Sequence, residues 1–118
     1  MATADFRVYS SWFARGTSLA APLGEGMTVS ARGCIGLQGE GGYRLFIYFL
    51  EDGDTIPPGT YSPETMAGCL FLPLSEWADY VAFVQGSPGL CAHVDSVAPE
   101  ANAVQSVLQI DPDAVRRG

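Results

Sequence analysis

The chain has 118 residues, of which 47% are hydrophobic, and its formal net charge is −7 because thirteen acidic residues outnumber six arginines and there is no lysine. A chain of this length and composition can bury a sizeable core, which argues against a disordered chain and predicts a single domain over residues 1–118. Since no basic patch can form, the composition argues against direct binding to nucleic acid and against adhesion to an anionic membrane surface.

The N-terminal third predicts two strands separated by a loop. Side chains over Phe6–Phe13 place aromatic residues on both alternating faces, which is typical of a strand. Gly16–Gly26 contains Pro22 and several small residues, and this composition predicts a surface loop. Met27–Gln38 alternates between apolar and polar side chains, as expected for a strand with one buried face.

The densest apolar run, Tyr43–Leu50, predicts the central strand of the sheet. A hairpin should join it to Met27–Gln38 through a three-residue loop at Glu40–Gly42. A slip of one residue would exchange the two faces of a strand, so the apolar faces must be in register. This constraint requires the numbers of paired residues to sum to an even value. We choose a sum of 82, which leaves the three-residue loop and places Ile35 opposite Ile47 and Leu37 opposite Leu45.

The C-terminal half is expected to contain an acidic turn, an edge strand, a buried strand, a helix and a further strand. In chain order these are Glu51–Asp54, Thr60–Ser62, Met66–Leu72, Ser75–Gln85 and Leu90–Val97. Ser75 is a good N-cap for the helix, and Phe83 lies off its apolar stripe and is expected to be exposed. Residues 99–110 fit a helix and a strand equally well. The expected fold is α+β, with a mainly antiparallel sheet of about five strands packed by one or two helices.

Cys91, His93 and Asp95 should share one face of the last strand, because they are two residues apart. Together they are candidate catalytic residues, in which a cysteine nucleophile is activated by a histidine that a carboxylate orients. The alternative is structural: a small buried cysteine, a hydrogen-bonded histidine and an aspartate at the strand end. The trio could also bind a metal with Cys34 or Cys69, but this spacing matches no known ligand pattern, so no metal and no cofactor is expected.

An aromatic surface is expected on the other face of the hairpin. It contains Phe46 and Tyr48, is flanked by Arg32 and Arg44, and is joined by Tyr9 or Phe13 of the first strand. The two arginines are expected to lie about 20 Å apart, too far to clamp one ligand together. An apolar surface of this kind must be covered by a helix, a ligand or a second chain. If one helix covers the opposite face, this face becomes the candidate partner-binding surface.

The cysteine pattern indicates the cellular compartment in which the chain is expected. Three cysteines at wide spacing form no disulfide framework and no C-x-x-C pair, and the first thirty residues contain no secretory signal pattern. The chain is therefore expected in the reducing cytoplasm. Tyr43–Leu50 is far shorter than the roughly 20 apolar residues that span a bilayer, so no association with a membrane is expected.

These observations predict a non-catalytic acidic interaction module. It would bind a protein partner, as a small inhibitor or immunity-type protein does, or form a homodimer, through the surface of Arg32, Arg44, Phe46 and Tyr48. One alternative is a small enzyme that uses Cys91 and His93. Another is a small-ligand-binding domain whose pocket lies between the sheet and Gly16–Gly26.

Overall fold

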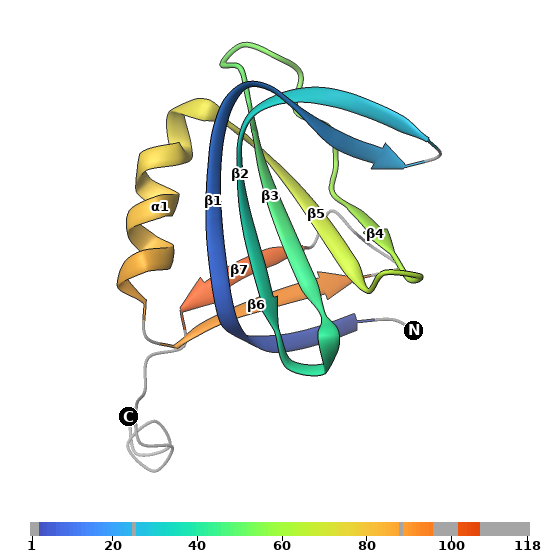
Figure 1. Ribbon diagram of the computed structural model, residues 1–118, viewed down its shortest axis with the longest axis vertical. Helices are drawn as coiled ribbons and strands as arrows, with labels where there is room; N and C mark the ends of the chain where they lie inside the picture. Colours follow the sequence, from blue (N-terminus) through green and yellow to red (C-terminus); the bar gives the residue numbers. More distant parts are fainter. Residues whose placement is uncertain (1–2, 25, 88, 96–101, 107–118) are drawn as a thin grey trace.

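The computed structural model describes residues 3–24, 26–87, 89–95 and 102–106 (Figure 1). These residues form one sheet of seven strands and one α-helix, with the strand order β4-β5-β3-β2-β1-β6-β7. The elements are β1 (Thr3–Gly24), β2 (Met27–Gly39), β3 (Arg44–Leu50), β4 (Thr60–Ser62), β5 (Ala67–Pro73), α1 (Trp77–Gly86), β6 (Leu90–Asp95) and β7 (Ala103–Ser106). All neighbouring strands are antiparallel except β3 and β5, which are parallel.

The fold is dominated by its sheet, as expected, but the predicted number of about five strands was too low. Both edge strands, β4 and β7, join the sheet. In the ambiguous region 99–110, residues Ala103–Ser106 form a strand, and the other residues of that region lie outside the described part of the chain. The predicted strand Leu90–Val97 is observed to Asp95, and residues 96–97 are likewise not described. No helix among the described residues is long and apolar enough to cross a membrane.

The predicted loop at Gly16–Gly26 was wrong, because β1 continues to Gly24 and pairs with β2 over most of its length. The register of this pairing shifts at Val8/Ser10, Arg15/Leu19 and Pro22/Gly24. Such irregularities bend a strand. After Arg7, β1 pairs with β2 alone, so its other side is free and tolerates proline, because the N–H groups there need not join a ladder. The composition of this segment therefore looks like a loop although its backbone is extended.

The first residues of β1 pair with a different strand from the rest. Thr3–Arg7 pairs with β6, while the remainder of β1 pairs with β2. Between the two parts β1 passes very close to Gly39, where a Cβ atom would lie 1.9 Å from the carbonyl oxygen of Arg7. The bend turns the sheet over itself, and Figure 1 shows β6 and β7 crossing the direction of β2, β3 and β5.

The main core lies inside this folded sheet. Its buried residues are Phe6, Ile35, Leu37, Leu45, Ile47, Phe49, Val84, Leu90, Ala92 and Val94. The predicted hairpin register is confirmed, because Ile35 pairs with Ile47 and Leu37 with Leu45. The predicted three-residue loop is also present, as a 3-10 turn at Glu40–Gly42 in which Gly41 and Gly42 have positive φ. Glycine adopts this backbone conformation without the steric cost that other residues meet.

Helix α1 packs against the main core through aromatic contacts. The ring of Phe49 meets Trp77 and Tyr80 edge to face, with centroids 5.1 and 5.9 Å apart. Gly33 makes room for this contact, since a Cβ there would lie 2.8 Å from the Trp77 ring. Phe83 was expected to be exposed, but it is half-buried and packs edge to face on Tyr80. Its contact with the core extends the buried side of the helix beyond the stripe that helical spacing predicts.

The start of the helical segment depends on a distant residue. Ser75 was expected as the N-cap but lies inside a 3-10 turn at Leu74–Glu76 that precedes α1. The backbone N–H of Ser75 donates to Oδ1 of Asp52, at 2.9 Å. The acidic turn after β3 thus supplies a side-chain acceptor to the unpaired N–H groups of the first helical turn.

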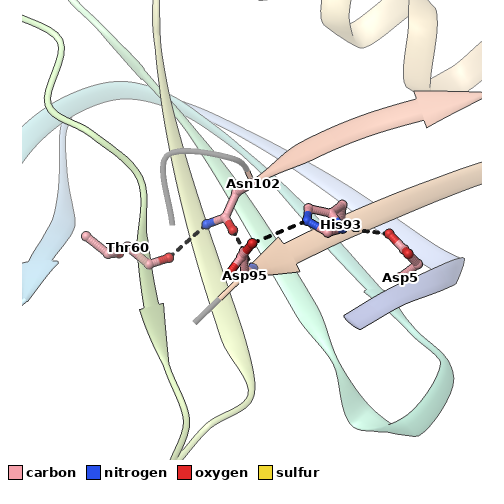
Figure 2. Close-up of polar contacts among 5 residues, drawn as sticks. All are labelled: Asp5, Thr60, His93, Asp95 and Asn102. Atoms are coloured by element: carbon pink, nitrogen blue, oxygen red, sulfur yellow. Dashed lines mark hydrogen bonds and ion pairs between the residues drawn. The ribbon is translucent and has the colours of Figure 1, made fainter. Parts of the chain in front are cut away.

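A buried amide holds the two ends of the sheet together (Figure 2). Asn102 is only 3% exposed, and its Oδ1 accepts the backbone N–H of Asp95 at 2.8 Å. Its Nδ2 donates to the carbonyl oxygens of Thr60 and Cys69, at 2.9 and 3.0 Å. Asn102 lies next to β7, whereas Thr60 belongs to β4, the opposite edge strand. Gly68 allows the close approach, because a Cβ there would lie 2.7 Å from Val94.

We expect Asn102→Ala to lower the free energy of unfolding by about 2–3 kcal/mol, because it leaves three backbone groups without their partner. Asn102→Asp should be at least as destabilising, since it places a carboxylate oxygen against two carbonyl oxygens. Urea unfolding followed by circular dichroism measures both changes. The control is Gln38→Ala, which removes an exposed amide from β2. A change of less than about 0.5 kcal/mol in Asn102→Ala would contradict this role.

Candidate functional site

The face of β2, β3 and β5 that points away from the main core, here called the outer face, carries a continuous row of aromatic rings. The centroids of Trp12 and Phe46 are 6.0 Å apart, those of Phe46 and Tyr48 6.4 Å, and those of Tyr48 and Phe71 5.9 Å. Separations of this size are typical of interacting aromatic pairs. The expected aromatic surface of Phe46 and Tyr48 is therefore present, and Trp12 and Phe71 extend it.

Trp12 joins the row because a glycine lies beneath its ring. Trp12 pairs with Gly36, which in turn pairs with Phe46 across the next strand. A Cβ on Gly36 would lie 2.1 Å from the indole, so only glycine lets the ring cross β2 and reach Phe46. The expected contribution of Tyr9 or Phe13 was wrong: Phe13 packs on the main core, and Tyr9 is exposed at the irregularity in β1.

The end of the β1–β2 hairpin covers part of the outer face. It contributes Ala21 and Ala31 to a second apolar cluster with Leu50, Cys69 and Phe71. Figure 1 shows this end of the hairpin bending over β3 and β5. The cover is incomplete, because Phe46 and Tyr48 are packed against this cluster and remain only partly buried.

A cavity of about 370 Å³ remains beside the partly covered rings, and we call it the outer pocket. Its floor comes from β3 and β5, one wall from β4 and the following turn, and Pro22 of the hairpin borders it. The lining residues are Pro22, Arg44, Phe46, Tyr48, Thr60, Tyr61, Ser62, Thr65, Ala67 and Cys69. Three of the four residues predicted for a partner-binding surface thus meet at one pocket.

The fourth predicted residue, Arg32, has a different environment. Its guanidinium forms an ion pair with Glu51, and it does not line the outer pocket. Arg44 donates from Nη2 to the carbonyl oxygen of Thr65 at 3.1 Å, and its Cζ lies 5.8 Å from the ring centroid of Phe46. The two arginines therefore have separate partners.

Apart from Arg44, the floor of the outer pocket is electrically neutral at ordinary pH. Burial raises the pKa of the Cys34 thiol, which lies opposite Tyr48, to about 12. Burial also raises the pKa of Tyr48 and of Cys69. A thiol with a raised pKa is a poor nucleophile, because the reactive form is the thiolate. These cysteines therefore act as small apolar side chains.

The predicted catalytic residues lie on another part of the molecule. Cys91, His93 and Asp95 share the less buried face of β6, as expected. Nδ1 of His93 lies 2.7 Å from Oδ1 of Asp5, and its Nε2 lies 3.9 Å from Oδ2 of Asp95 (Figure 2). Both ring nitrogens thus face carboxylates, and within the described residues no hydrogen bond joins Cys91 to His93.

Two residues of this region could not be recognised from the sequence. Asp5 meets His93 only because β1 and β6 pair in a register that places them opposite each other. Asn102 meets β4 and β5 only after the sheet has folded over. The described part of the chain contains no group of three His, Cys, Asp or Glu residues that could hold a metal ion.

The catalytic hypothesis can be tested by the reactivity of the cysteines. We expect iodoacetamide to modify Cys91 first, because Cys91 is partly exposed while Cys34 and Cys69 are buried with raised pKa values. His93→Gln should leave the rate at Cys91 within about twofold, since the histidine makes no hydrogen bond to this thiol. Mass spectrometry of the native protein measures the rates, and Cys91→Ser identifies the fast site. A loss of about tenfold or more in His93→Gln would instead support a catalytic pair.

Comparison with known proteins assigns no family and no function to the chain. No family model, no curated protein and no solved structure matches the chain.

Proposed function

We propose that the protein is a binding domain for a small, largely apolar ligand, and that its site is the outer pocket. The supporting observation is a cavity of about 370 Å³ over Phe46 and Tyr48. Pockets for small molecules typically enclose about 300–1,000 Å³ and combine apolar walls with a few polar groups. The outer pocket has this character, because its aromatic floor is bordered by hydroxyl groups and one guanidinium.

The pocket arises from the way the hairpin end packs. Ala21 and Ala31 are small, so the hairpin comes close to the cluster of Leu50 and Phe71. Both alanines are completely buried there. The hairpin does not extend over Phe46, whose ring stays partly accessible. A ligand over this ring would gain about 2.5 kcal/mol for each 100 Å² of apolar surface that it removes from water.

The proposal is tested by protein-observed NMR with a fragment library. We expect aromatic fragments to shift the amide signals of Phe46, Tyr48 and Ala67 in the ¹⁵N-labelled protein. Ala67→Leu should abolish these shifts, because Ala67 lines the pocket and a larger side chain would fill it. Ala78→Leu, on an exposed position of α1, is the matched control and should bind like the wild type. Fragments that shift only other amides, or none, would contradict the proposal.

The exposure of Trp12 supports a second candidate, the interaction module expected from the sequence. This side chain is 49% exposed at the end of the aromatic row. Tryptophan is among the residues that contribute most to binding energy at protein interfaces. The partner would be a basic protein, as suits the net charge of −7, or a second copy of the chain.

For this candidate, light scattering after size exclusion should show a dimer of the pure protein, or a complex in host-cell extract. Trp12→Glu should abolish the association by placing a charge in the interface, while the fold is retained. Ile56→Glu changes another exposed apolar residue and should associate normally. Wild-type protein that elutes as a monomer, alone and in the extract, would rule out this use of the surface.

A further inference from the structure

We propose that the ligand of the outer pocket carries a carboxylate beside a planar apolar body, and that Arg44 binds this carboxylate. This inference rests on the proposed function and specifies the ligand class. Three observations support it: the charge of the pocket, the free donors of Arg44, and the aromatic floor.

The charge of the pocket is opposite to that of the chain. Acidic residues outnumber arginines by thirteen to six overall, but the lining contains one arginine and no carboxylate. The nearby Glu64 does not line the pocket and is exposed. Its Oε1 accepts a hydrogen bond from the Ser62 hydroxyl, with the two oxygens 3.1 Å apart. A negatively charged ligand would therefore meet a local positive charge inside an otherwise acidic protein.

Arg44 is held in place and still has donors to offer. One N–H donates to Thr65, and the guanidinium rests over Phe46. An arginine has five N–H donors in a planar fork that fits a carboxylate with two parallel hydrogen bonds. Among the described residues no carboxylate forms an ion pair with Arg44, whereas Arg32 is paired with Glu51. Arg44 is thus the cation on this face that a ligand can use.

The floor selects the rest of the ligand. The rings of Phe46 and Tyr48 lie next to each other, and planar groups stack favourably on such rings. The Ser62 hydroxyl already donates to Glu64, and the other hydroxyl groups of the lining are neutral donors. Hydrogen bonds from a charged donor to a carboxylate are roughly twice as strong as those from neutral donors. Arg44 is therefore the principal donor for an anionic group, and the apolar floor receives the planar body.

The test compares 2-naphthoate with 2-naphthamide, which have the same planar body but differ in charge. Isothermal titration calorimetry should show that the wild type binds the acid about tenfold more tightly than the amide, or better, since hydrogen bonds to charged groups are the stronger ones. Arg44→Gln should reduce binding of the acid to the level of the amide and leave the amide unchanged. Arg32→Gln, on the same face but outside the pocket, is the matched control and should not affect either ligand.

The outcomes separate this inference from the proposed function. If naphthoate and naphthamide bind equally tightly and both shift the backbone NMR signals of Phe46 and Tyr48, the inference is overturned and the pocket proposal remains intact. Failure of the wild type to bind either probe would overturn both. If Arg44→Gln does not fold, salt provides the second measurement: added NaCl should weaken binding of naphthoate to the wild type but not that of naphthamide. Equal salt dependence of the two ligands would overturn the inference.

Discussion

The bend of β1 determines both faces of the sheet. This strand pairs with β6 through Thr3–Arg7 and with β2 thereafter, so it belongs to both halves of the folded sheet. The bend next to Gly39 encloses the main core, because it brings Ala92 and Val94 of β6 over the inner side of β2 and β3. The irregularity between Arg15 and Leu19 then lets the rest of the hairpin turn over the outer face. Without these two bends, β6 would not cover the inner side of β2 and β3, and the end of the hairpin would not cover the outer face.

The outer pocket depends in addition on the buried amide of Asn102. Strand β4, which forms one wall of the pocket, has only three residues and pairs with β5 alone. An edge strand of this length has few ladder hydrogen bonds to hold it. Asn102 adds one bond to this wall, at the carbonyl oxygen of Thr60, and a second to the floor, at that of Cys69 in β5. The contact that closes the sheet therefore also fixes one side of the site.

Local patterns were sufficient for the central hairpin and insufficient for the long-range contacts. The register of β2 and β3 agreed with the one chosen from the sequence, because the apolar faces limit the possible pairings and a three-residue loop selects the one that places Ile35 opposite Ile47. The extended part of β1 after Gly16 was mistaken for a loop, because bulges and a free edge allow glycine and proline in a strand. The place of Trp12 in the aromatic row depends on Gly36, and the two residues meet only through the pairing of β1 with β2. A single sequence contains no signal for that pairing, nor for the meeting of Asp5 with His93.

The positions of the reactive side chains favour binding over catalysis at the outer pocket. The thiols beneath its floor are kept protonated by burial, and the only charged residue of its lining is an arginine, which does not exchange its proton at ordinary pH. The histidine of the chain lies on β6 and directs both nitrogens to carboxylates. General acid–base chemistry needs a group that gains and loses a proton within hydrogen-bond reach of the ligand. The outer pocket offers shape, an aromatic floor and one fixed positive charge, and these are the properties by which a protein recognises a ligand without transforming it.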